Sequence, residues 1–191
     1  MADATGEGYP LVLQSGADPS TLGGVAVCGL TTVGSVGVIA ASHLIASLGL
    51  KPMGTVLHPE FPAVALIQES VPKHPVRVYQ GEEMGVFISE IQFPQASDFQ
   101  FGNTVLEWFQ KGGFDKLVII DGLVSEDLGL KEDGDIWGVA SLQSGRDALD
   151  TVDIQRIQQG IVTGVSGFLL AEGERQGLDI TCLLYTSPSP R

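Results

Sequence analysis

Gly29-Leu-Thr-Thr-Val-Gly-Ser-Val-Gly37 is the stretch that decides the fold. The apolar run Val25-Ala-Val-Cys28 precedes it and the apolar segment 36–48 follows it, so the order is strand, glycine-rich turn, helix. Backbone N–H groups at a helix start lack partners within the helix, and ligands of α/β proteins often bind at this junction. The turn therefore either holds a ligand or lets a helix pack closely on a sheet.

A second junction of the same kind lies near the other end of the chain, where Ile161-Val-Thr-Gly-Val-Ser-Gly167 leads into an apolar helix. Between the two, Lys116-Leu-Val-Ile-Ile-Asp-Gly122 is a buried, β-branched strand, and strands also follow one another directly within 63–91. Strands that alternate with helices indicate helices on both faces of a sheet. We predict a three-layer α/β/α fold with a mixed, mostly parallel sheet, as in phosphorylases and hydrolases.

Two patterns predict how elements are buried. The helix at 36–48 is apolar on nearly every side, which is typical of a helix that is buried on both faces. Val76-Arg-Val-Tyr79 alternates apolar and polar residues, which is typical of a strand with one face in water.

The chain divides into three parts. We expect residues 1–22 to form a flexible segment with a short strand at 11–13. Residues 23–181 are expected to form a single α/β domain. Cys182-Leu-Leu-Tyr-Thr-Ser-Pro-Ser-Pro-Arg191 resembles the translation of a sequencing-library adaptor. We therefore expect residues 182–191 to be non-native and the domain to be truncated; a short, disordered native tail is the alternative.

Composition excludes several classes of function. The net charge is −13, from 23 acidic and 10 basic residues, which disfavours nucleic acids and anionic membrane surfaces as partners. The acidic surface either is only solvated or meets a basic protein. No apolar run is long enough to span a bilayer, and the two cysteines have no metal-binding or disulfide spacing. We expect a cytoplasmic protein without cofactor or metal.

Known catalytic motifs fail at the glycine-rich turns. Gly29 and Gly34 have the spacing of a phosphate-binding loop, but Ser35 and Val36 stand where that loop requires Lys and Ser or Thr. The glycines also miss the dinucleotide pattern, and Ser35 lacks the flanking glycine spacing of a nucleophile elbow. The histidines have no zinc-site spacing. We therefore expect no catalytic residues.

Some residues still stand out as candidates for a ligand site or an interface. Arg77, Glu90 and Asp121 lie on predicted strands or at their ends. In a phosphorylase-like protein such residues would bind phosphate or a sugar; the alternative is solvated strand ends and ion pairs. His43 is expected to be a hydrogen-bonded residue of the core or of an interface. The candidate set is Gly29, Gly34, Ser35, Gly37, His43, Arg77, Glu90, Gly164 and Gly167.

Several segments between about residues 24 and 180 share the order and spacing of one known family: Val33-Gly-Ser-Val-Gly-Val-Ile-Ala-Ala-Ser-His-Leu-Ile45, Met53-Gly, His58-Pro-Glu-Phe-Pro-Ala-Val64, Lys73-His-Pro-Val-Arg-Val-Tyr79, Ile88-Ser-Glu-Ile91 and Gly160-Ile-Val-Thr-Gly-Val-Ser-Gly-Phe-Leu-Leu-Ala-Glu172. In these segments the chain resembles the archaeal and bacterial relatives of the second proteasome assembly chaperone. Each segment alone is a weak match; together they are a strong one.

The resemblance implies a non-catalytic protein that binds α subunits of the 20S proteasome and forms homo-oligomers. Several relatives are expected to dock through a C-terminal hydrophobic residue, Tyr and any residue. Leu183 or Leu184, followed by Tyr185-Thr186, mimics that tail, but it is internal and lies in the segment expected to be non-native, so we set it aside. Two alternatives stay open: a phosphorylase-like enzyme or nucleoside- or phosphate-binding protein that uses both glycine turns, and a scaffold for another protein.

Overall fold

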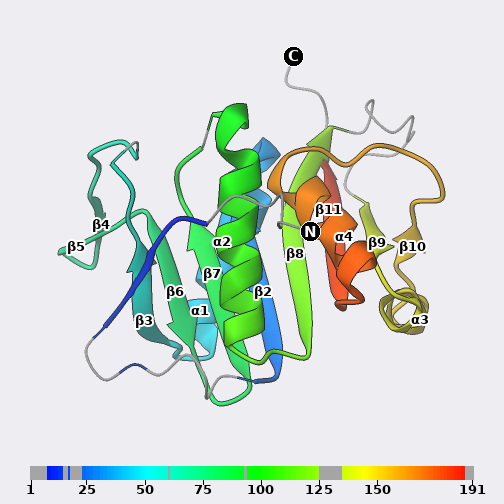
Figure 1. Cartoon of the computed structure of the whole chain (residues 1–191), viewed down its shortest axis with the longest axis horizontal. Coiled ribbons are helices and arrows are strands. Elements are labelled where there is room, and N and C mark those ends of the chain that lie inside the picture. Colours follow the sequence, from blue (N-terminus) through cyan, green and yellow to red (C-terminus); the bar gives the residue numbers. More distant parts are fainter. Residues whose placement is uncertain are drawn as a thin grey trace, which may run out of the picture.

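The computed structural model describes residues 8–14, 17, 23–59, 61–92, 94–124 and 135–187 (Figure 1). The strands are β1 (Leu11–Leu13), β2 (Val25–Leu30), β3 (Lys51–Val56), β4 (Leu66–Gln68), β5 (Val71–Lys73), β6 (Val76–Gln80), β7 (Met84–Ser89), β8 (Lys116–Val124), β9 (Ile136–Ala140), β10 (Gln155–Arg156) and β11 (Ile180–Ser187). The α-helices are α1 (Val36–Ser47), α2 (Asp98–Lys111), α3 (Gln143–Thr151) and α4 (Gly164–Gln176), and two 3₁₀ turns are η2 (Val33–Ser35) and η3 (Gln95–Ser97).

Nine of these strands form one mixed sheet in the order β1-β3-β6-β7-β2-β8-β11-β9-β10. Parallel pairing joins β7, β2, β8 and β11 at its centre and β9 to β10. The other four neighbouring pairs are antiparallel. The mixed sheet is therefore confirmed, but parallel pairs are not the majority among the described strands. β4 and β5 form a separate hairpin.

The three-layer arrangement is also confirmed. α2 and α4 pack side by side on one face of the sheet, and α1 lies on the opposite face (Figure 1). α3 packs on β9 and β10 near the far edge, where Leu149 meets Gly138. In the part of the chain that the structure describes, no helix combines the length and apolarity needed to cross a membrane.

Each face of the sheet has its own apolar core. Under α2 and α4, Phe87, Phe101 and Trp108 are almost completely buried and lie edge to face, with ring centroids 5.5–5.6 Å apart for the two pairs that involve Phe87. Under α1 the core is smaller, and Val27, Val86 and other buried residues pack against Ala41. The two cores explain why the central strands are apolar on both faces.

The prediction that helix α1 is buried on both faces is wrong for the chain by itself. Ala41 faces the sheet and is completely buried, whereas Ile39 on the outer side is 64% exposed. Although the helix has no polar stripe, no other part of the described chain covers its outer side.

The prediction that strand β6 has one face in water is also wrong. Val76 and Val78 belong to the larger core, while Tyr79 belongs to the core beneath α1. Arg77 is 6% exposed, because it points to the α1 side and is neutralised there by Glu90. Because Glu90 balances its charge, Arg77 can stand at a polar position of the alternating pattern although neither face of this strand is in water.

The folded part extends upstream of residue 23. The predicted strand at 11–13 is confirmed as β1, which pairs antiparallel with β3. Tyr9 is 4% exposed and contacts the rings of His58 and Phe61. The rest of the segment expected to be flexible, residues 1–7, 15, 16 and 18–22, lies outside the described residues.

At the other end, strand β11 runs from Ile180 to Ser187 between β8 and β9. Cys182, Leu184 and Thr186 are buried in the larger core face of the sheet, at alternate positions as a strand requires. The sheet thus includes part of the segment 182–191, whose non-native origin stays a prediction. Leu184, Tyr185 and Thr186 are paired within this strand, so they form no docking tail.

Candidate functional site

The two glycine-rich turns meet at one edge of the sheet. The turn after β2 and the start of α4 both line a pocket of about 320 Å³ at the carboxyl ends of β2, β7 and β8. The starts of α2 and α4 also meet there, since a methyl group added to Gly164 would lie 3.8 Å from Asp98 Oδ2. This edge is where ligands of open α/β sheets bind.

Packing requires most of the glycines at this edge. A methyl group added to Gly29 would lie 2.3 Å from the carbonyl oxygen of Gly37, and one added to Gly122 would lie 1.8 Å from that of Val33. A methyl group on Gly167 would likewise lie 2.2 Å from the carbonyl oxygen of Val162. Contacts below 3 Å leave no room for a side chain, so these backbones touch.

Gly34 and Ser35 shape the turn before α1 through their backbone conformation rather than through close packing. Their φ angles are +68° and +52°, in the left-handed region that costs a non-glycine residue free energy. Ser35 precedes the first residue of α1, but its side chain makes no capping hydrogen bond. The turn reverses sharply here, so α1 starts directly against the sheet.

The floor of the pocket is a carboxylate held by a hydroxyl. Ser166 Oγ donates a 2.5 Å hydrogen bond to Asp121 Oδ2, and the Gly122 backbone N–H donates to Asp121 Oδ1 at 2.7 Å. Asp121 is 8% and Ser166 2% exposed. Asp98 adds a second carboxyl group, and burial raises its pKa above the ordinary value.

The chemistry of this pocket suits hydrogen-bond donors rather than anions. The described residues of its lining include two carboxyl groups and several hydroxyls, but no Lys, Arg or His. A phosphate would meet negative charge without a balancing cation, although the start of α4 supplies backbone N–H groups. The pocket can accept hydrogen bonds from hydroxyl or ammonium groups.

Two cysteines lie in the core near Asp121. Cys28 and Cys182 occupy β2 and β11 and face the same register position, Ile119 of the intervening strand. Burial, and then the charge of Asp121, raises the pKa of both thiols well above the ordinary range. A thiol of raised pKa is a poor nucleophile, so these cysteines are core residues.

Arg77 and Glu90 form a buried ion pair on the other face of the sheet from Asp121. The guanidinium donates from Nε to the Tyr79 hydroxyl at 3.0 Å, and its two terminal nitrogens reach the His74 carbonyl oxygen and Glu90. All three nitrogens are therefore engaged within the protein. Of the two alternatives predicted for these residues, a phosphate or sugar site and an ion pair, they form the ion pair. Neither of them lines the pocket between the glycine-rich turns.

His43 lies on the exposed side of α1, where it exchanges a 3.3 Å hydrogen bond with Ser47. It is remote from the pocket lining. Within the described ranges, no three His, Cys, Asp or Glu side chains come together as a metal site would require.

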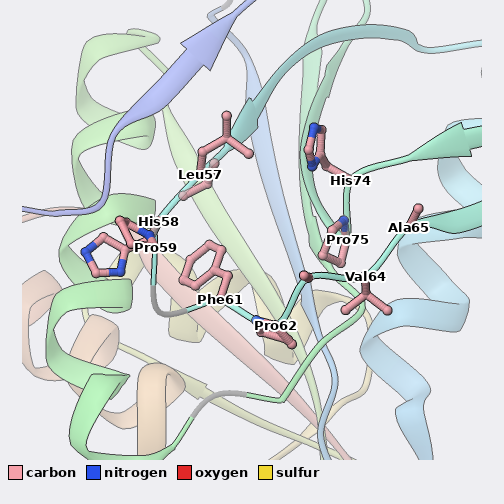
Figure 2. Close-up of a pocket in the computed structure, with 11 residues that line it drawn as sticks. Leu57, His58, Pro59, Phe61, Pro62, Val64, Ala65, His74 and Pro75 are labelled. Atoms are coloured by element: carbon pink, nitrogen blue, oxygen red, sulfur yellow. The ribbon is translucent and has the colours of Figure 1, made fainter.

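A larger apolar groove, of about 560 Å³, was not singled out by the sequence patterns. Figure 2 shows its labelled residues from Leu57 to Ala65 curving around it, with Phe61 between Leu57 and Pro62 and with Val64 and Ala65 on the same side as His74 and Pro75. Among the described residues, no Asp, Glu, Lys or Arg lines it. The available signal was the density of prolines at 59, 62 and 75, which fixes an extended loop beside the sheet.

Taken together, the mixed sheet, the helices on both faces and the closely packed glycine junctions define an α/β/α domain with a small acidic edge pocket. The sequence profile of the PAC2 family matches residues 26–191. The chain therefore belongs to the PAC2 family, as the resemblance implies. Among curated proteins, none matches this chain.

Solved structures of this fold come from archaea and bacteria. Pyrococcus furiosus PbaA, described as an archaeal homolog of proteasome-assembly chaperone, is 25% identical, with a TM-score of 0.80 over 93% of this chain and 76% of its own. Pyrococcus furiosus PbaB, described as an archaeal proteasome activator, is 19% identical, with a TM-score of 0.72 over 93% and 80%. A PAC2 family protein from Streptomyces avermitilis is 18% identical, with a TM-score of 0.62 over 86% and 75%.

Proposed function

We propose that this chain is a non-catalytic, cytoplasmic binding protein that associates with α subunits of the 20S proteasome and assists its assembly or activation. The observation that carries the proposal is the match to a protein described as a proteasome-assembly chaperone homolog, over 93% of this chain at a TM-score of 0.80. Membership of the PAC2 family supports it.

The edge pocket supports binding rather than phosphate or nucleoside chemistry. Among the described residues that line it, the carboxyl groups have no balancing cation and the serines have no histidine to act as a base. Arg77, the cation expected to serve a phosphate, is occupied by Glu90 on the other face. A phosphorylase-like enzyme would need these groups together.

Surface composition supports a protein as the partner. The described residues that line the Figure 2 groove are mostly apolar and include no Asp, Glu, Lys or Arg, whereas the chain as a whole carries a net charge of −13. A mostly apolar groove in an acidic protein is the pattern of a protein interaction site. We also propose that the chain forms a homo-oligomer, as the resemblance to its family implies.

A pull-down tests the proteasome partner. The full chain is immobilised and incubated with purified 20S α subunits of the same organism, before and after they assemble into rings. We expect capture of α subunits above a bovine serum albumin control. Absence of capture in both states would overturn the proposal.

Thermal shift separates this function from the alternative. The melting temperature is measured with inorganic phosphate, nucleosides and nucleotides over a range of concentrations. A non-catalytic binding protein shows no saturable increase, whereas a phosphorylase-like protein gains stability as its site fills. A saturable increase with phosphate and a nucleoside together would favour the enzyme.

A further inference from the structure

The outer side of helix α1 presents to solvent a face without Asp, Glu, Lys or Arg. Ile39, His43 and Ala46 recur at the i, i+4, i+7 spacing of this face, and all three are exposed. Ile39 is 64% exposed although it is fully apolar. On the inner side, Gly37 and Ala41 are buried against the sheet. Nothing in the described chain covers the outer side, whose polar residues are His43 and its hydrogen-bond partner Ser47.

Charge distinguishes this face from the rest of the protein. No Asp, Glu, Lys or Arg occurs between Pro19 and Leu50, in a chain with 23 acidic and 10 basic residues. Each of the other three described α-helices, α2, α3 and α4, carries three charged side chains, and α1 carries none. A surface helix normally has a charged outer face, so α1 has the composition of a covered helix.

The face continues beyond the helix into a groove that no described Asp or Glu lines. Ile45 of α1 lines this groove of about 550 Å³, which also contains the exposed Val12 and Val71 and the proline of β3, Pro52. Its charged lining residues are Lys73 and Arg77, and Glu90 pairs with Arg77. A 12-residue helix is only ~18 Å long. A stable interface buries about 800 Å² on each partner, so it needs both the helix and its surroundings.

We propose that this face of α1, with the adjoining groove, is where a second copy of the chain docks. The proposal rests on the self-association given under the proposed function and names its surface. Two copies with a net charge of −13 each repel one another wherever acidic faces meet. A face without Asp or Glu among its described residues is where that repulsion is weakest, and a two-fold axis across α1 would bring the same residues of both copies together. Small residues such as Ala46 and Ser47 permit a close approach.

A charge placed in this face tests the proposal. We expect Ile39→Asp to raise the dissociation constant of the oligomer at least about tenfold, because each contact would bury two unpaired carboxylates. The matched control is Ile161→Asp, at a residue that is 80% exposed and far from α1 in the sequence. Sedimentation velocity over a concentration series measures the constant, and circular dichroism checks that each variant is folded.

The outcomes separate the two proposals. A wild-type chain that is monomeric at every concentration overturns self-association, and this inference with it, while capture of 20S α subunits can still succeed. A wild-type oligomer that Ile39→Asp leaves unchanged overturns only the assignment to α1. If the Ile39→Asp variant keeps the wild-type oligomer but no longer captures 20S α subunits, the assignment to α1 is also overturned, because this face then binds a different protein.

Disulfide crosslinking tests the same face without added charge. Both native cysteines are completely buried, so a cysteine introduced on the surface is the reactive thiol. We expect His43→Cys or Ala46→Cys to form a covalent dimer under mild oxidation, and Val152→Cys, at a residue that is 63% exposed, to form much less. Equal yields at all three positions would overturn the proposal.

Discussion

Gly29 of β2 and Gly37 of α1 touch through their backbones, with only 2.3 Å between the carbonyl oxygen of Gly37 and a methyl group added to Gly29. A methyl group on Gly37 would in turn lie 2.3 Å from the carbonyl oxygen of Ile120. Helix and sheet can approach this closely only where neither residue has a side chain. Packing therefore explains these two glycines of the turn, whereas a phosphate site does not.

The first prediction concerns Gly37→Ala. Helix propensity alone predicts that alanine stabilises α1 by about 1 kcal/mol. The contact with the Ile120 carbonyl opposes this, because backbone cannot move aside as a side chain can. We expect a net loss of about 2 kcal/mol in the free energy of unfolding, measured by urea denaturation. A stabilised variant would show that the helix is not packed this closely.

Gly81→Ala is the matched comparison for that variant. The added methyl group would lie 2.8 Å from Leu50 Cδ2, the end of a flexible side chain. Leu50 can change rotamer, so we expect a smaller loss than at Gly37. Equal losses at both sites would mean that backbone contact is not the cause.

The second prediction concerns the two thiols beside Asp121. Burial is the main cause of their raised pKa and the charge of Asp121 the smaller one. We therefore expect Cys28 and Cys182 not to react with Ellman's reagent at pH 8 in the native protein, and both to react after denaturation. Asp121→Asn should leave them unreactive as long as it stays folded. Rapid labelling of the native protein would contradict their burial.

Much of the fold could be predicted from local patterns. Strand β2, the glycine turn and helix α1 have the predicted order, and the strands predicted at 11–13 and 116–122 are found as β1 and β8. Short-range signals also end helices, since Gly112 directly follows α2 and Gly177 directly follows α4. These features depend on neighbouring residues, which the sequence displays directly.

The errors involve contacts between distant residues. Arg77 is buried because Glu90 reaches it from the next strand, and strand alternation cannot show a partner 13 positions away. The outer face of α1 has the composition of a buried helix without being covered in the chain by itself. The Figure 2 groove depends on how the 57–65 loop folds back toward Pro75, which no periodicity specifies.

The third prediction concerns the boundary at residue 181. A chain that ends at Thr181 loses the buried Cys182, Leu184 and Thr186 and leaves β8 and β9 without the strand between them. Unpaired backbone groups and lost apolar burial both oppose folding. We expect this chain to show no cooperative melting by circular dichroism. A chain that ends at Ser187 is the control and should melt like the full chain.

The fourth prediction compares two carboxyl groups whose pKa values shift in opposite directions. Burial raises the pKa of Asp98, so its ionisation costs stability as pH rises through the folded pKa. Hydrogen bonding to Lys111 lowers the pKa of Glu107, so its stabilising effect is present at neutral pH and is lost as pH falls. Relative to wild type, Asp98→Asn should gain stability between pH 3.5 and pH 7, and Glu107→Gln should lose it. Melting temperatures across that range measure both, and the same sign for both would contradict the assigned causes.

The fifth prediction concerns the buried pair of Arg77 and Glu90. Arg77→Met leaves the Glu90 carboxylate buried without its cation, so we expect a loss of about 3 kcal/mol in the free energy of unfolding. Adding Glu90→Leu removes the stranded charge and should restore most of that loss, since an apolar pair can replace a buried ion pair. Urea denaturation of both single variants and the double variant completes the cycle. Additive losses would mean that the two residues are not coupled, and a ligand role for Arg77 would then have to be reconsidered.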